Sequence, residues 1–387
     1  MSESSHSSPT HHTEGAKQVS WLELFYDLVF VAATITFSDA VSSRPDGETI
    51  GLAVGAFAIT WWIWLTTTLF ANRFALDDML QRVLILVQML LLTMLAITVA
   101  DGIHSHPGLV ALLFAFLCLD VSAMHARVTR RPGAYGALAR SRRTEYAIAT
   151  VPLLLAWAFP GPARWVLWPI AMAIIVIPGL AYRLGRRPGE APVHDDHLVE
   201  RFGLLTILVI GEAFVKVALL ASEGTLESID LFVLPTLFAL VFAIWWSYFD
   251  DVPDAGLPNE NGKLAGWFGG HLLLQVSIVG IAVGYSKLLR LELGETIDLD
   301  RVALVVGPMI GVYLAMAAVG ACTRRRPVGP LLALRMLSAA VLVPVGVLIW
   351  QASWITVDVA ALVLAGLGLA HGAAAAVLLR TTRVLDA

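Results

Sequence analysis

Two carboxylates lie four residues apart in a long apolar stretch near the start of the chain. Glu23 and Asp27 belong to the segment WLELFYDLVFVAATITFSDAV at 21–41. This spacing places both acids on one face of a helix, and Thr34 and Ser38 fall on the same stripe. A charged side chain at mid-bilayer costs about 2.5–3.5 kcal/mol on insertion scales. We therefore expect the stripe to face a bundle interior or a wet cavity.

The composition indicates which kind of protein holds these acids. Of 387 residues, 58% are hydrophobic and only 14% are charged, whereas soluble domains have about 25% charged residues. The sequence therefore predicts an all-α, polytopic integral membrane protein.

Apolar runs of about 20 residues, the length that crosses a bilayer, predict about 12 membrane-spanning helices. The boundaries at 160–162 and 350–354 are the least marked, and without them the count would be ten or eleven. The predicted helices lie near 21–41, 50–71, 80–100, 107–127, 144–160, 163–183, 198–222, 229–249, 266–290, 302–321, 328–350 and 354–380.

The basic residues support this count. With a cytoplasmic amino terminus, 20 of the 26 Lys and Arg residues lie on the cytoplasmic side and 5 lie outside, as the positive-inside rule requires. We predict an inner (plasma) membrane protein with both termini in the cytoplasm. The arginines from Arg127 to Arg143 are expected to meet anionic lipid headgroups of the bilayer. They require no nucleic-acid partner.

Short matches between the two halves predict an internal 6+6 repeat. They are Glu23-Leu24-Phe25 with Glu200-Arg201-Phe202, Trp61-Trp62 with Trp245-Trp246, and Gln88 with Gln275. Six helices in each unit would give both halves the same orientation, related by an axis along the membrane normal. The predicted organisation is a disordered cytoplasmic tail 1–20, a first half 21–183, a cytoplasmic linker 184–197, a second half 198–380 and a cytoplasmic tail 381–387.

The seventh predicted helix is the most polar. His197 and Glu200 have a spacing that could hold a metal on one helix face, but no matching second ligand set exists, so capping and solvation are favoured. We predict no metal and no cofactor. Arg201 follows directly. Glu212 and Lys216 form either an ion pair that tolerates burial or part of a permeation or proton pathway.

Other polar and small residues favour packing roles. His271 and Gln275 are expected to make interhelical hydrogen bonds rather than carry out proton chemistry. Glycine pairs four apart, such as Gly51/Gly55 and Gly280/Gly284, predict close helix contacts. Trp61, Trp62, Trp64, Trp245 and Trp246 are expected in an aromatic belt at the cytoplasmic ends of their helices.

The segments WLELFYDLVFVAA at 21–33 and HLVERFGLLTILVIGEA at 197–213, with Trp61-Trp62, Asn72-Arg73-Phe74 and Gly270-His271, carry a family resemblance. The sequence resembles the bacterial low temperature requirement protein A family. This resemblance implies a multi-pass bacterial membrane protein linked to growth in the cold, with no settled biochemical activity.

Three functions stay open on the sequence. The first is a transporter or channel for a small cation or polar solute, with Glu23, Asp27, Glu212 and Lys216 in the pathway. The second is a membrane-embedded lipid-modifying enzyme, which is disfavoured because no nucleophile or metal triad is recognisable. HExxH and GxSxG motifs are also missing, and the lack of a Walker loop argues against an ATP-driven pump. The third is a non-catalytic membrane sensor or scaffold. A homo-oligomer is compatible with each.

Overall fold

The computed structural model describes residues 19–43, 45–101, 105–162, 164–184, 193–222, 228–258, 261–324 and 329–385. The predicted tail 1–20, the linker 184–197 and the tail 381–387 lie wholly or partly outside the described residues.

Within the described residues the chain is helical, apart from one isolated bridge between Thr296 and Thr356. The helices are α1 (Trp21–Ser43), α2 (Gly47–Phe74), α3 (Met79–Ala100), α4 (Pro107–Ala126), α5 (Gly133–Ala158), α6 (Arg164–Leu184), α7 (Asp195–Ser222), α8 (Ser228–Phe249), the single turn α9 (Val252–Ala255), α10 (Asn261–Leu288), α11 (Leu299–Ala321), α12 (Gly329–Gln351) and α13 (Val357–Leu385). Each predicted span corresponds to one long helix.

Ten of these helices are long and apolar enough to cross a membrane by length and composition, counting only the described residues. The other two long helices are α5 and α6. Helix α5 begins at Gly133, well before its predicted start, because the arginine-rich segment that precedes the apolar run is helical as well. In α6 the apolar part is the shorter stretch Val166–Ile177. The architecture is that of a polytopic helical membrane protein.

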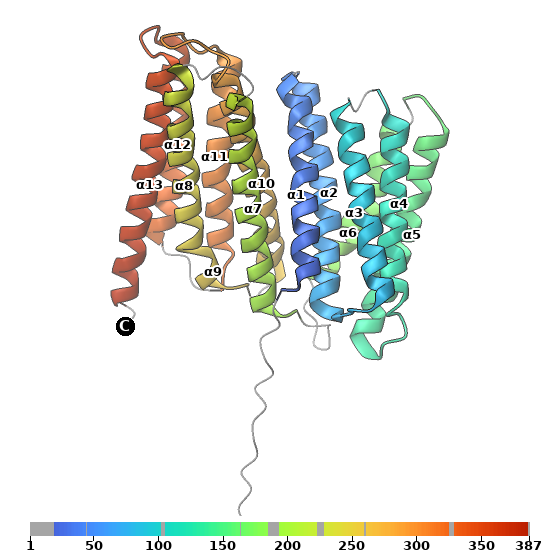
Figure 1. Cartoon of the computed structure of the whole chain (residues 1–387). Helices are drawn as coiled ribbons and strands as arrows, with labels where there is room; N and C mark the ends of the chain where they lie inside the picture. The colour runs from blue at the N-terminus through green and yellow to red at the C-terminus, as the bar shows by residue number, and fades with distance from the viewer. Residues whose placement is uncertain are drawn as a thin grey trace, which may run out of the picture.

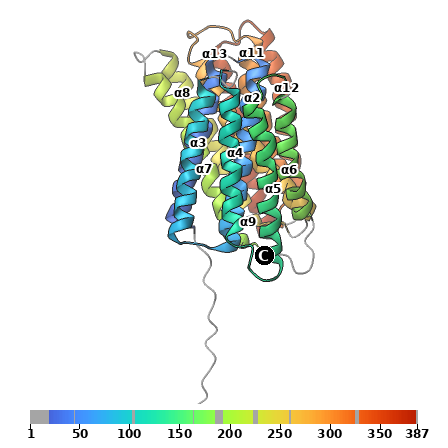
Figure 2. The ribbon, with the colours of Figure 1, turned by 90° about the vertical axis from the view of Figure 1, so that its right-hand side faces the viewer.

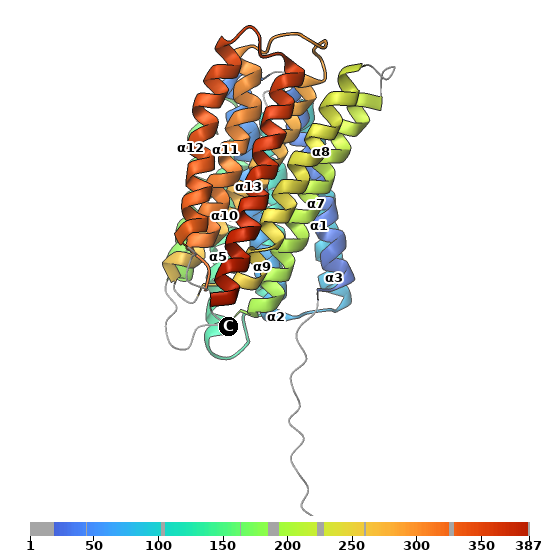
Figure 3. The same cartoon turned by 90° about the vertical axis from the view of Figure 1, so that its left-hand side faces the viewer.

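The helices form two groups that lie side by side, α1–α6 and α7–α13 (Figure 1). Helix α1 is central, because it packs against α2 and α3 of its own group and against α7 and α10 of the other. The side views show the long helices running between the same two ends of the bundle (Figures 2 and 3). The start of α1 and the end of α13 lie at one end (Figure 1).

The tryptophans of α2 correct one sequence prediction. Trp61 and Trp64 are almost completely buried, so they do not form an aromatic belt. Trp61 Nε1 donates a hydrogen bond to Gln275 Oε1 at 2.6 Å, and Trp64 Nε1 donates to Asp27 Oδ1 at 2.7 Å. A buried indole N–H needs such a partner, and both partners lie on other helices.

Helices α10 and α11 approach each other closely at glycines. A Cβ atom on Gly280 would lie 2.8 Å from Pro308 Cγ, and one on Gly284 would clash with the Leu304 carbonyl oxygen. The predicted close contact is therefore confirmed for this pair. It is wrong for Gly51 and Gly55, where a Cβ would meet nothing within 4 Å.

These two glycine environments generate a stability prediction. The Gly284→Ala protein should lose about 1–3 kcal/mol of stability, because the added methyl group overpacks a backbone contact. Gly51→Ala is the matched control, and it should lose nothing since its Cβ meets open space. The measurement is the thermal unfolding midpoint of the purified proteins in one detergent. Equal midpoints would contradict the close α10–α11 contact.

Candidate functional site

The first turn of α1 is closed by a capping box. Ser20 N–H donates to Glu23 Oε2 at 2.8 Å, and Glu23 N–H donates to Ser20 Oγ at 3.3 Å. Each side chain thus satisfies a backbone donor that the helix start leaves free. Glu23 therefore has a structural role that could have been found from the Ser-x-x-Glu pattern before an apolar run.

The other oxygen of Glu23 belongs to a buried ion-pair cluster. Arg201 Nη1 lies 2.9 Å from Glu23 Oε1, and Arg201 Nη2 lies 2.6 Å from Asp27 Oδ1. The side chains of Arg201 and Asp27 are 1% and 0% exposed. Thr68 accepts a further hydrogen bond from Arg201 at 3.3 Å. We call Glu23, Asp27 and Arg201 the Arg201 cluster.

A histidine and an asparagine complete this region. His197 Nε2 lies 3.4 Å from Glu23 Oε1, and His197 Nδ1 lies 3.1 Å from Asn72 Nδ2. Because the asparagine amide is a donor, His197 Nδ1 is assigned as the acceptor, so the neutral ring has its proton on Nε2, the nitrogen nearer Glu23. Asn72 also exchanges two hydrogen bonds with the backbone of His194. The carboxyl-terminal part of α2 is thereby joined to the start of α7.

The Arg201 cluster contains more acid than base. Two carboxylates share one guanidinium, and Asp27 Oδ2 is buried with no hydrogen-bond partner among the described residues. The ionised cluster has one negative charge in excess, so binding one proton or one small cation would make it neutral. Within the described residues no group of three His, Cys, Asp or Glu side chains could hold a metal ion.

A cavity of about 210 Å³ reaches this cluster between α1, α2 and α3. We call it the Glu23 cavity. Its wall contains Glu23, Arg201, Tyr26 and Thr67, and its rim contains Asp77. Glu23 and Arg201 of the cluster therefore border a cavity at the end of the bundle where α1 begins.

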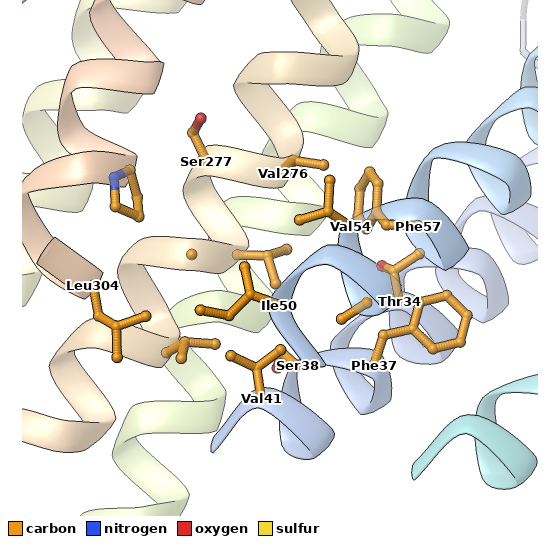
Figure 4. A pocket seen from close by; sticks show the side chains of 15 residues that line it. Thr34, Phe37, Ser38, Val41, Ile50, Val54, Phe57, Val276, Ser277 and Leu304 are labelled. Carbon is orange, nitrogen blue, oxygen red and sulfur yellow. The ribbon is translucent and has the colours of Figure 1, made fainter. Parts of the chain in front are cut away.

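A second pocket, of about 200 Å³, lies toward the other end of α1. We call it the Ser38 pocket. It is lined by α1, α2, α10 and α11, and its walls are mostly apolar, with Thr34, Ser38 and Ser277 as the hydroxyl-bearing residues (Figure 4). It therefore spans the boundary between the two helix groups.

Aromatic rings separate the cavity from the pocket. Phe30 lies between them on α1, with its ring centroid 6.3 Å from Phe57 and 6.0 Å from Trp64. Phe202 of α7 packs edge-on against Trp64 at 5.1 Å and against Trp61 at 6.1 Å. We call Phe30, Trp61, Trp64 and Phe202 the aromatic layer.

The structure gives Lys216 a partner other than Glu212. Lys216 Nζ lies 2.7 Å from Asp39 Oδ1 on α1 and donates to Ser38 Oγ. Glu212 is half-buried and Glu200 is exposed. The ion pair between Glu212 and Lys216 that the spacing suggests is absent among the described residues, because Lys216 points to α1.

His271 and Gln275 make the interhelical hydrogen bonds expected of them. His271 Nε2 accepts from the Tyr248 hydroxyl of α8 at 3.0 Å, while Nδ1 donates to the Trp267 carbonyl at 2.9 Å. Gln275 binds Trp61 across the two helix groups. Both side chains therefore pack the interior of the bundle near Phe202, and neither lines the Glu23 cavity.

Fold and site together define a polytopic helical membrane protein with a charged cluster buried between its two helix groups. A model of the family described as bacterial low temperature requirement A protein (LtrA) matches residues 18–377. The chain belongs to this family. It is also similar to the uncharacterized protein RA0937 of Rhizobium meliloti (strain 1021), with 26% identity over 290 residues, or 69% of this chain and 68% of the relative.

The two roles of Glu23 can be separated by substitution. Glu23→Gln keeps a capping-box side chain but removes the charge, whereas Glu23→Ala removes both. We expect Glu23→Ala to be about 1 kcal/mol less stable than Glu23→Gln, because the alanine protein lacks the cap. Thermal unfolding of both purified proteins measures this. An alanine protein as stable as the glutamine protein would show that the cap contributes nothing.

A double-mutant cycle tests the partner of Lys216. Lys216→Met and Asp39→Asn should show a coupling of about 1 kcal/mol, because the pair is partly shielded and one partner is exposed. The matched cycle of Lys216→Met with Glu212→Gln should show almost none. The midpoints of thermal unfolding give both couplings. A larger coupling with Glu212 would show that Lys216 pairs with Glu212 on α7 and not with Asp39.

Proposed function

We propose that the protein is a transporter or channel for a small cation or polar solute, and that the Arg201 cluster is its binding site. The observation that carries this proposal is the Glu23 cavity, which brings a buried site with excess acid into contact with the end of the bundle where α1 begins. A site that only stabilised the fold would not need an approach from solvent.

The arrangement along α1 supports the same function. The Ser38 pocket approaches α1 from the opposite end, and the aromatic layer separates it from the Arg201 cluster. Two partial openings divided by a thin closed layer are what alternating access requires. In the proposed arrangement both chain ends face the cytoplasm, the Glu23 cavity opens inward, and the two halves are an internal repeat in one orientation.

A membrane sensor or scaffold is the second candidate. The observation that favours it is the aromatic layer itself, since its rings are packed at centroid distances of 5.1–6.1 Å around Trp64 and Phe202. A sensor would use the cavity for binding, and the closed layer would stay closed.

Ion flux distinguishes these functions. The purified protein in liposomes is given gradients of H⁺, Na⁺ or K⁺, and ion-sensitive dyes inside the liposomes report the initial rate. Glu23→Gln and Asp27→Asn should each lower that rate about tenfold or more, because about 1.4 kcal/mol of lost stabilisation changes a rate tenfold.

Matched controls come from α7. Glu200→Gln and Glu212→Gln each remove one acid outside the Arg201 cluster and should keep the wild-type rate. If no ion crosses the membrane but an added ion still raises the thermal unfolding midpoint of the protein, the result would favour the sensor. Equal flux in wild-type and Asp27→Asn liposomes would place the pathway away from the cluster.

A further inference from the structure

A second buried acid lies in the first helix group, away from the Arg201 cluster. Asp120 is in the interior of α4 and is 6% exposed. Gln88 of α3 donates from Nε2 to Asp120 Oδ2 at 2.9 Å. The same amide accepts at Oε1 from the Thr67 hydroxyl at 2.8 Å. The orientation of the Gln88 amide is therefore fixed at both ends.

The other oxygen of Asp120 has no hydrogen-bond partner in the part of the chain that the structure describes. Oδ1 is buried without a hydrogen bond among the described residues, and none of the ion pairs formed by these residues includes Asp120. Helix α4 packs against α2, α3 and α5. The other titratable groups on these four helices are Glu48, Arg73, Arg82, Cys118, His125, Tyr135, Arg140, Arg142, Arg143, Glu145 and Tyr146. Arg82 is paired with Asp77 and Arg142 with Glu145, and the Tyr146 hydroxyl contacts Thr66.

An ionised Asp120 would be expensive in this position. A carboxylate deep in the bilayer costs about 2.5–3.5 kcal/mol on insertion scales, and one hydrogen bond from a neutral amide returns about 0.5–1.5 kcal/mol. A carboxylic acid carrying a proton has no charge to bury. It still accepts the hydrogen bond from Gln88 at the oxygen that lacks the proton.

The site also lies close to a cavity. Thr67 and Tyr26 both line the Glu23 cavity, and Thr67 contacts Gln88, which contacts Asp120. The Tyr26 hydroxyl is another buried oxygen without a partner among the described residues. Asp120 is thus one side chain behind the wall of the Glu23 cavity.

We propose that Asp120 is a proton-binding site, held by Gln88 and reached from the Glu23 cavity. Uptake forms one carboxyl O–H bond with a proton from water in the cavity, and release breaks that bond. No other bond changes. The site is separate from the Arg201 cluster, so it stands whether or not the protein transports a solute.

Infrared spectroscopy of the full-length protein in lipid nanodiscs tests this site. At neutral pH the wild-type spectrum should contain the carbonyl band of a protonated carboxylic acid, and Asp120→Asn should lose that band. Asparagine has the shape of the protonated acid and can accept the same hydrogen bond, so the variant should fold. Asp77→Asn is the control, since Asp77 is 71% exposed and paired with Arg82. That substitution should leave the band unchanged.

Labelling provides a second measurement on the unmodified chain. Dicyclohexylcarbodiimide reacts with protonated carboxyl groups in apolar surroundings, and mass spectrometry should find the adduct on Asp120. Added Na⁺ should leave both band and adduct unchanged. A spectrum without the band, or labelling that omits Asp120, would show an ionised carboxylate and overturn the proposal. Loss of band and adduct in Na⁺ would make Asp120 a metal-cation site and also overturn it.

Discussion

The buried guanidinium of Arg201 is the group on which the interface between the two helix groups depends. Removing one partner of a buried ion pair costs about 3–5 kcal/mol, and here α7 supplies the single cation for two acids of α1. The contact can be satisfied only with α1 and α7 side by side. The same residue lies 5.9 Å from the Trp64 ring centroid, a distance at which a cation interacts favourably with an aromatic face. The position of α2 is thus coupled to the same charge.

The helices themselves could be predicted from the sequence, because a membrane span is defined by the length of an apolar run. The side-chain pairs could not, because they depend on the rotation of each helix about its axis. Arg201 and Asp27 are 174 residues apart in the chain, and no local pattern indicates their contact. Local spacing suggests Glu212 as the partner of Lys216, yet the rotation of α7 turns the lysine toward Asp39.

Two further differences have similar causes. The predicted span 50–71 places Trp61, Trp62 and Trp64 near its cytoplasmic end, where an aromatic belt is expected. Helix α2 is longer, with 28 residues, and Trp64 is buried well before its last residue. Asp120 is visible as a single acid within the apolar run 107–127. Its significance depends on Gln88, on a different helix, and on the lack of an ion-pair partner among the residues that the structure describes. Neither is visible from one helix.

Under the proposed transport function, the distribution of bonds around the Arg201 cluster predicts which helix would move. Glu23 Oε2 is used by the capping box, so a cation entering the Glu23 cavity can compete for Glu23 Oε1 and Asp27 Oδ2 without unwinding α1. The groups it would displace, Arg201 and His197, both belong to α7. Phe202 is the next residue on that helix and packs within the aromatic layer against Trp64. A shift of α7 that released Arg201 would carry Phe202 with it, as helix shifts at packed interfaces do. Charge neutralisation at the cluster and opening of the layer would therefore be one motion.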